Sequence, residues 1–200
     1  MNMVKCVSIL GSTGSIGRQS LDIISRLPEI RVAALTAGSS VARMAEQCRR
    51  FRPQLAVMAT QQAAQALAEE ISDLPTRVSW GEAGLIEAAT LDGVDCVITA
   101  VVGMVGLKPT LAAIRAHKRI GLANKETLVC AGEIVMAEAE QHGVEIIPVD
   151  SEHSAIFQCL MGNVEKRQVK RIILTCSGGP FFGKKREELK NVTRSEGAHV

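Results

Sequence analysis

The sequence has 200 residues, 46% of them hydrophobic, and its 23 basic and 21 acidic residues give a formal net charge of +2. This length accommodates one domain, or one domain and part of a second, around a sizeable apolar core. The near-neutral charge and the 2% of aromatic residues give no reason to expect a nucleic-acid or membrane partner.

The N-terminal segment runs directly into a glycine-rich turn, so it is typical of a first strand and not of a signal peptide. The longest apolar run, Cys96 to Leu107, is interrupted by Thr and Gly and is shorter than the roughly 20 residues that span a bilayer. The six cysteines are scattered, which excludes the spacing of a zinc or disulfide framework. We therefore expect a cytoplasmic protein.

Short β-branched runs alternate with longer segments whose apolar residues recur at helical spacing, such as Gln61–Ile71 and Leu107–His117. The predicted strands are Lys5–Leu10, Val32–Thr36, Leu55–Met58, Arg77–Ser79, Cys96–Ala100, Arg119–Leu122, Glu145–Val149 and Arg171–Thr175. This alternation predicts an α/β fold, a Rossmann-like doubly wound parallel sheet with helices on both faces.

A glycine-rich turn, Gly11–Gly17 (GSTGSIG), follows the first predicted strand and precedes the apolar-periodic segment Gln19–Leu27. Glycines allow the backbone to turn tightly and to approach a pyrophosphate, and a helix N-terminus supplies N–H groups and a positive dipole. The spacing is G-x-x-G-x-x-G rather than G-x-G-x-x-G, so a strand–helix turn without a ligand is the alternative interpretation.

The end of the second predicted strand indicates which nicotinamide cofactor binds. NAD sites usually have an acidic residue there that binds the ribose 2′-hydroxyl. No acidic residue occurs between Glu29 and Glu46, and Arg43 follows one turn later. The sequence therefore predicts NADP rather than NAD, although Ser39 or Ser40 could equally cap the next helix.

Polar triplets follow two later strands. Asn124, Lys125 and Glu126 come after Arg119–Leu122, where an ammonium group can bind a polar substrate beside the cofactor. A solvated loop is an equally good interpretation of this triplet.

Asp150 and Glu152 follow Glu145–Val149, and two carboxylates at a strand end can bind one Mg²⁺ or Mn²⁺ ion. Capping of the next helix explains these two acids equally well. Ser177 begins Ser-Gly-Gly-Pro, which is either an anion-binding turn or an ordinary tight turn.

Four segments together carry a resemblance to a known family: GSTGSIG at 11–17, LANKE at 122–126, DSEHSAIFQ at 150–158 and SGGPF at 177–181. In order and spacing the chain resembles 1-deoxy-D-xylulose-5-phosphate reductoisomerases along nearly its whole length. The resemblance implies an enzyme of isoprenoid precursor synthesis that uses NADPH and Mg²⁺, Mn²⁺ or Co²⁺. It would isomerise and reduce 1-deoxy-D-xylulose 5-phosphate to 2-C-methyl-D-erythritol 4-phosphate, and it would be a homodimer.

The resemblance also implies roles for individual residues. The implied NADPH contacts are Thr13, Gly14, Ser15, Ile16, Gly38, Ser39, Ser40, Asn124 and Glu126. The implied substrate contacts are Lys125, Ser151, Glu152 and Ser177, and the implied metal ligands are Asp150 and Glu152. Lys125, Asp150 and Glu152 are therefore the expected catalytic residues.

The chain departs from the family in two ways. Family members commonly have a basic residue and an Asn where this chain has Ser39 and Ser40, which weakens the expected recognition of the 2′-phosphate. The family also continues well past residue 200, with a third metal-binding Glu, a substrate-binding His, further phosphate contacts, a mobile lid and a helical domain. We expect residues 1–149 to form the NADP-binding domain and residues 150–200 to begin an α+β catalytic domain. The chain alone would then be inactive, and an NADP-binding module without turnover is the alternative function.

Overall fold

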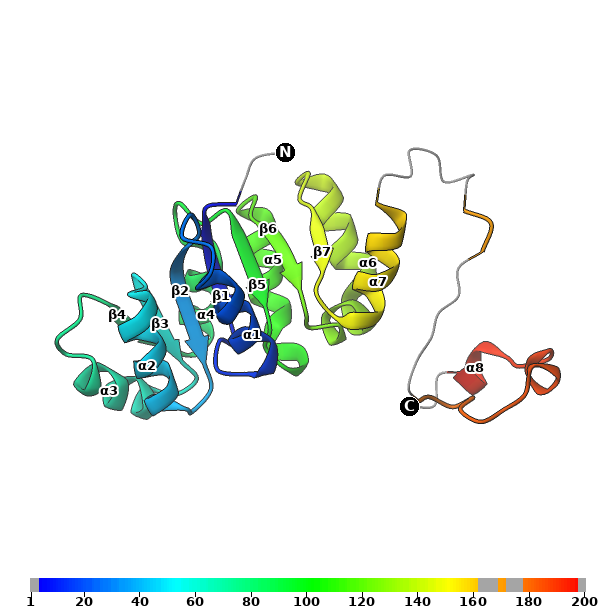
Figure 1. The fold of residues 1–200 in the computed structure, drawn as a ribbon, viewed down its shortest axis with the longest axis horizontal. Helices are drawn as coiled ribbons and strands as arrows, with labels where there is room; N and C mark the ends of the chain where they lie inside the picture. The colour runs from blue at the N-terminus through cyan, green and yellow to red at the C-terminus, as the bar shows by residue number, and fades with distance from the viewer. Residues whose placement is uncertain (1–3, 162–168, 172–177, 198–200) are drawn as a thin grey trace. The chain divides into compact units, whose positions relative to one another are not determined.

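The computed structural model describes residues 4–161, 169–171 and 178–197. The chain divides into two compact units, Met1–Asp150 and Ser151–Val200. The first unit is a sheet covered by helices, and the described part of the second contains α7 (Ser151–Leu160), the short 3-10 helix η3 (Arg186–Leu189) and α8 (Arg194–Gly197) (Figure 1). The predicted strand Arg171–Thr175 lies, apart from its first residue, outside the described residues.

Seven parallel strands of the described residues form one sheet, in the order β4-β3-β2-β1-β5-β6-β7. The strands are β1 (Cys6–Leu10), β2 (Arg31–Ala37), β3 (Leu55–Met58), β4 (Arg77–Trp80), β5 (Cys96–Thr99), β6 (Arg119–Leu122) and β7 (Ile146–Pro148). The seven strands predicted before residue 150 are confirmed, with ends that differ by a residue or two.

The strand order reverses at β1, which pairs with β2 on one side and with β5 on the other. In open α/β sheets, ligands bind beyond the carboxyl ends of the strands at such a reversal. The chain segments that follow β1 and β5 are therefore where a nucleotide is expected.

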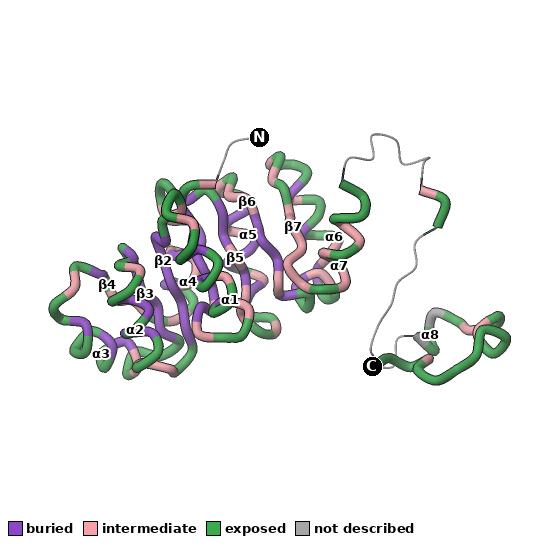
Figure 2. The backbone as a smooth tube through the Cα atoms, in the orientation of Figure 1, coloured by how far each residue is buried: buried purple, intermediate pink, exposed green. Residues whose placement is uncertain are grey.

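Helices cover both faces of the sheet, as predicted (Figure 1). On one face lie α1 (Ser15–Ile24), α2 (Val41–Phe51) and α3 (Gln61–Glu70), and on the other lie α4 (Gly81–Thr90), α5 (Leu107–Arg115) and α6 (Glu126–Gln141). Each face has its own buried apolar cluster, and Figure 2 shows the buried backbone concentrated in the strands between the two helical layers.

Alternation along β1 shows why the sheet needs both layers. Val7 and Ile9 pack in the cluster with α1, α2 and α3, whereas Cys6 and Leu10 pack in the cluster on the opposite face. Ile9 and Leu10 are fully buried, and burying each such side chain contributes about 1.5–3 kcal/mol. A strand that is apolar on both faces fits only between two helical layers.

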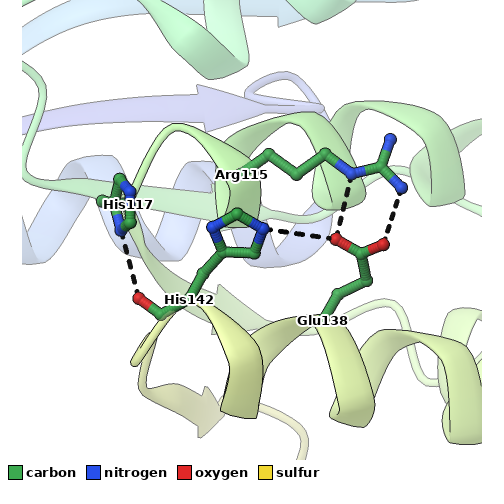
Figure 3. Close-up of polar contacts among 4 residues, drawn as sticks. All are labelled: Arg115, His117, Glu138 and His142. Carbon is green, nitrogen blue, oxygen red and sulfur yellow. Dashed lines mark hydrogen bonds and ion pairs between the residues drawn. The ribbon is translucent and has the colours of Figure 1, made fainter.

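An ion-paired cluster joins the C-terminal ends of α5 and α6 (Figure 3). The Arg115 guanidinium donates to both carboxylate oxygens of Glu138, at 2.9 and 2.7 Å, and holds the pKa of Glu138 below its ordinary value. His142 Nε2 lies 3.6 Å from the same carboxylate, and a ring nitrogen of His117 lies 3.1 Å from the His142 carbonyl oxygen. These contacts hold α5 and α6 together at the end of the sheet where β6 and β7 begin, opposite the end that has the glycine turn.

The longest helix of the described residues, α6, has 16 residues and a break at Ala131, where φ is −142° and ψ is 25°. Within the described ranges, no helix is long and apolar enough to cross a membrane.

Candidate functional site

The glycine turn lies at the carboxyl end of β1, between β2 and β5. Gly11 has φ of 87°, in the left-handed region, and a Cβ there would lie 2.6 Å from the Ala100 carbonyl oxygen. The backbone N–H groups of Gly11 and Ser12 donate to the Thr36 carbonyl oxygen at 3.1 and 2.8 Å. Only glycine fits the first position, because the backbone of the segment after β5 approaches so closely.

The other two glycines of the turn differ in what surrounds them. A Cβ at Gly17 would lie 2.3 Å from the Gly11 carbonyl oxygen, so this glycine lets α1 pack directly on the turn. A Cβ at Gly14 would lie 3.4 Å from the same oxygen, which is close to an ordinary contact. Gly14 is exposed and precedes α1 as its N-cap, so its open side can accept a ligand without disturbing the turn.

Helix α1 begins directly after Gly14, with the predicted cofactor contacts Ser15 and Ile16 in its first turn. The first N–H groups of a helix have no acceptor within the helix, and they carry partial positive charge. No acidic residue lies in this first turn, and Gly14 offers no side chain to cap it. Thr13 is half-buried beside it. The arrangement suits an anion such as a pyrophosphate.

A buried pair of hydrogen bonds anchors the turn to α2. The Ser12 hydroxyl donates to Gln47 Oε1 at 2.6 Å, and Gln47 Nε2 donates to the Ser12 carbonyl oxygen at 2.9 Å. Both residues are buried. The sequence did not indicate this pair, because its two members are 35 residues apart.

The segment after β2 contains the predicted contacts Gly38, Ser39 and Ser40. Gly38 and Ser39 are exposed, and Ser40 takes the N-cap position of α2 without a capping hydrogen bond from its side chain. Within the described residues, neither serine hydroxyl has a side-chain hydrogen bond, and the first turn of α2 has no acidic residue. The Arg43 guanidinium reaches back to the glycine turn, with Nη1 3.3 Å from the Thr13 carbonyl oxygen.

Asn124 follows β6 and is buried, with all four hydrogen-bonding positions of its carboxamide in use. Its Nδ2 donates to the carbonyl oxygens of Val101 and Gly103 at 2.6 and 2.7 Å. Its Oδ1 accepts from the N–H and the hydroxyl of Thr127, both at 2.9 Å. The side chain thus joins the segment after β5 to the start of α6, and its predicted contact with NADPH remains a prediction.

Lys125 and Glu126 lie at the start of α6 and are exposed. Strand β6 pairs with β7 so that Leu122 is opposite Pro148, and the Val149 N–H donates to the Leu122 carbonyl oxygen at 2.9 Å. Lys125 and Asp150 therefore follow neighbouring strands at the same edge of the sheet. This places one predicted substrate-binding cation and one predicted metal ligand at adjacent strand ends.

Ser151 and Glu152 begin α7 in the second unit, where the Ser151 hydroxyl donates to a Glu152 carboxylate oxygen at 2.8 Å. In the part of the chain that the structure describes, no three His, Cys, Asp or Glu side chains are grouped to hold a metal ion. Ser177, the predicted phosphate-binding serine, lies outside the described residues.

Two models of one protein family match the chain. The model of 1-deoxy-D-xylulose 5-phosphate reductoisomerase matches residues 7–132, and the model of the C-terminal domain of the same enzyme matches residues 146–199. The chain belongs to the 1-deoxy-D-xylulose 5-phosphate reductoisomerase family. The resemblance inferred from the four sequence segments is therefore confirmed.

Curated members of the reductoisomerase family are about half identical to this chain. The 1-deoxy-D-xylulose 5-phosphate reductoisomerase of Lachnospira eligens is 55% identical over 189 residues, which cover 94% of this chain and 50% of the relative. That of Symbiobacterium thermophilum is 54% identical over 199 residues, which cover 97% of this chain and 51% of the relative. The chain thus spans about half the length of the curated relatives it matches.

Solved reductoisomerase structures have the same fold. The enzyme from Zymomonas mobilis in complex with NADPH superposes with a TM-score of 0.82 at 40% identity, covering 99% of this chain and 52% of that one. A reductoisomerase in complex with NADPH, fosmidomycin and magnesium superposes with a TM-score of 0.81 at 39% identity, covering 96% of this chain and 50% of that one.

Proposed function

We propose that this chain provides the NADPH-binding domain, and the first metal- and substrate-binding residues, of a 1-deoxy-D-xylulose 5-phosphate reductoisomerase. The reaction is the NADPH- and divalent-metal-dependent isomerisation and reduction of 1-deoxy-D-xylulose 5-phosphate to 2-C-methyl-D-erythritol 4-phosphate. One observation carries the proposal. The glycine turn Gly11–Gly17 lies at the carboxyl end of β1, where the strand order reverses, in a chain that both family models match.

The turn and the segment after β2 would bind NADPH. The first N–H groups of α1 follow the exposed Gly14, which has no side chain to keep a pyrophosphate from the backbone. The adenosine end would lie by Gly38, Ser39 and Ser40, beside the first turn of α2, which has no acidic residue to repel a 2′-phosphate. A related structure contains NADPH, which supports this assignment. Thr13, Ser15, Ile16, Asn124 and Glu126 complete the proposed cofactor contacts.

The residues after β6 and β7 would bind the sugar phosphate and the metal. Asp150 and Glu152 offer carboxylate oxygens, the ligand type that Mg²⁺ and Mn²⁺ prefer. A divalent cation supplies Lewis-acid polarisation of substrate oxygens when it is bound. The Lys125 ammonium, exposed beside the end of β6, would orient an anionic or polar substrate group, and Ser151 and Ser177 would add hydroxyl contacts. A related structure that contains magnesium supports the metal assignment.

The same proposal includes a cellular location and an oligomeric state. We expect the enzyme to act in the cytoplasm, where NADPH and sugar phosphates are available, and we expect it to form a homodimer. Light scattering of the purified protein tests the oligomeric state.

A chimera tests the proposed reaction. In it, this chain replaces the matching half of the Symbiobacterium thermophilum relative, and NADPH oxidation is followed at 340 nm with 1-deoxy-D-xylulose 5-phosphate and Mg²⁺. Turnover by the chimera supports the proposed enzymatic activity if Lys125→Ala or Glu152→Gln abolishes it. The alternative function, an NADP-binding module without turnover, predicts that this chain binds NADPH tightly while the chimera folds and stays inactive.

A further inference from the structure

A groove of about 270 Å³ lies between α1, which begins after the glycine turn, and α2, which begins after β2. Its lining includes three arginines, Arg18 on α1 and Arg43 and Arg50 on α2. The proposed cofactor contacts Ser39 and Ser40 lie just before α2 and carry no charge. Arg43, in the first turn of α2, is the arginine of this groove that follows these serines most closely in the chain.

Two of these arginines contact the glycine turn itself. Arg43 Nη1 lies 3.3 Å from the Thr13 carbonyl oxygen, and Arg18 Nε lies 3.4 Å from the Gly14 carbonyl oxygen. The two guanidinium groups thus reach successive carbonyl groups from two different helices. Each uses one donor at the turn and keeps others for a ligand, because a guanidinium has five N–H donors.

Acidic as well as basic side chains line the groove. Within the described residues, neither Arg18 nor Arg43 forms an ion pair with a carboxylate. Asp22 also lines the groove, but its carboxylate pairs with Arg26 at 2.7 Å. Glu46, one turn after Arg43, is the other acidic residue of the lining.

The third arginine of the groove is placed differently. The Arg50 guanidinium lies 5.2 Å from the centre of the Phe51 ring, near the C-terminal end of α2. It is therefore about two helical turns from Arg43, at the end of the groove far from the glycine turn.

We propose that Arg43 and Arg18 bind the 2′-phosphate of NADPH in this chain, with the Ser39 and Ser40 hydroxyls as additional donors. The inference rests on the proposed function, since it names the residues that select NADPH over NADH at that site. Guanidinium groups bind phosphate oxygens through paired, charge-assisted hydrogen bonds, and arginine near the end of the second strand is a general solution for the 2′-phosphate. Ser39 and Ser40, which follow Gly38, carry no charge. Arg43 on α2 and Arg18 on α1 would supply the positive charge in their place.

Binding of NADPH and NADH to the 200-residue chain, measured by fluorescence titration, tests this assignment. Arg43→Ala and Arg18→Ala should each weaken NADPH binding about tenfold to a hundredfold, the loss expected for a hydrogen bond to a charged group. NADH affinity should change little, which also shows that each variant is folded. Arg43→Lys should keep part of the preference, because it retains the charge without the planar fork. Arg50→Ala, in the same groove but away from the turn, is the matched control and should leave both affinities unchanged.

The outcomes distinguish a failure of the 2′-phosphate assignment from a failure of the proposed function. If the original chain prefers NADPH and either alanine variant at Arg43 or Arg18 loses that preference, the assignment is supported. If both variants keep the original ratio of NADPH to NADH affinity, the assignment is overturned while nucleotide binding at the glycine turn stands. If the original chain binds neither nucleotide, the proposed function fails and the assignment fails with it.

Discussion

The side chain of Gln47 and the backbone and hydroxyl of Ser12 form a closed pair of hydrogen bonds, at 2.9 and 2.6 Å, in the buried space beneath the glycine turn. Ser12 belongs to the turn, whereas Gln47 lies in the middle of α2. The position of the turn therefore depends on a helix that starts after the next strand. This links the pyrophosphate end of the proposed site to the helix that carries Arg43.

Replacing Gln47 with alanine should destabilise the chain and weaken NADPH binding together. Gln47→Ala leaves the buried Ser12 carbonyl oxygen without the Gln47 Nε2 donor, while the Ser12 hydroxyl keeps the Thr36 carbonyl oxygen at 3.2 Å as an acceptor. The lost hydrogen bond costs about 1–3 kcal/mol of the free energy of unfolding. Urea unfolding measures the loss, and fluorescence titration measures NADPH affinity. Gln65→Ala is the control, since Gln65 is exposed on α3, away from the glycine turn. Equal stability of the Gln47 variant and the original chain would contradict the prediction.

Substitution at Gly14 should weaken NADPH binding but not folding, whereas substitution at Gly17 should destabilise the fold. Gly14→Val should leave the circular dichroism spectrum nearly unchanged, because a Cβ there lies 3.4 Å from its nearest neighbour, and should weaken NADPH binding by occupying the ligand's path. Gly17→Ala should lower the free energy of unfolding by about 1–3 kcal/mol or more, because its Cβ would overlap the Gly11 carbonyl oxygen. If Gly14→Val binds NADPH as the original chain does, the turn is only structural.

The strands and the glycine turn could be predicted because their signals are local. A strand buried on both faces is a short apolar run, and a nucleotide turn is a spacing of glycines between a strand and a helix. Asn124 shows where local signals end. The sequence placed it at a strand end, but its partners at Val101 and Gly103 lie more than 20 residues earlier. Only the pairing of β5 with β6 brings them together.

The structure also shows where the helices α5 and α6 end, which the residue patterns did not indicate. His117 follows α5 with φ of 56°, a left-handed conformation that glycine adopts with less strain. Gly143 takes the equivalent place after α6, with φ of 62°. The sequence predicted α5 to continue to His117, because apolar periodicity does not show where the backbone changes hand.

Buried thiols should make the chain less stable at alkaline pH. Burial raises the pKa of Cys48 and of Cys96 from 9.0 to about 11. In the unfolded chain these thiols ionise near pH 9, so from there up to about pH 11 proton loss favours unfolding. Their contribution is fully present below pH 9 and is lost progressively above it. Urea unfolding between pH 8 and 11 should show this decline.

Variants identify the source of the decline. Cys48→Ala and Cys96→Ala lower stability at every pH by opening a cavity, but each should make the dependence on pH shallower between pH 9 and 11. Cys130→Ala, at an exposed cysteine, is the matched control and should leave the dependence unchanged. An identical slope in all the variants would show that other groups cause the alkaline loss.

Asp150 and Glu152 are too few carboxylates to fill the coordination sphere of Mg²⁺ or Mn²⁺. Asp150 follows β7 and Glu152 lies in the first turn of α7, and sites for Mg²⁺ or Mn²⁺ with two carboxylates rely on water or substrate oxygens for the other positions. We therefore expect weak Mn²⁺ binding by this chain, strengthened by a chelating analogue of the substrate. Electron paramagnetic resonance of free Mn²⁺ during a titration measures the binding.

Asp150→Asn and Glu152→Gln should each lower Mn²⁺ affinity about tenfold or more, since each removes one of two charged ligands. NADPH affinity should remain nearly intact, because the proposed nucleotide contacts follow other strands. Asp92→Asn, at an exposed aspartate in the loop before β5, is the control for a general loss of negative charge. If the Asp150 and Glu152 variants bind Mn²⁺ as the original chain does, these carboxylates only stabilise the start of α7. The metal chemistry would then have to be assigned to other residues.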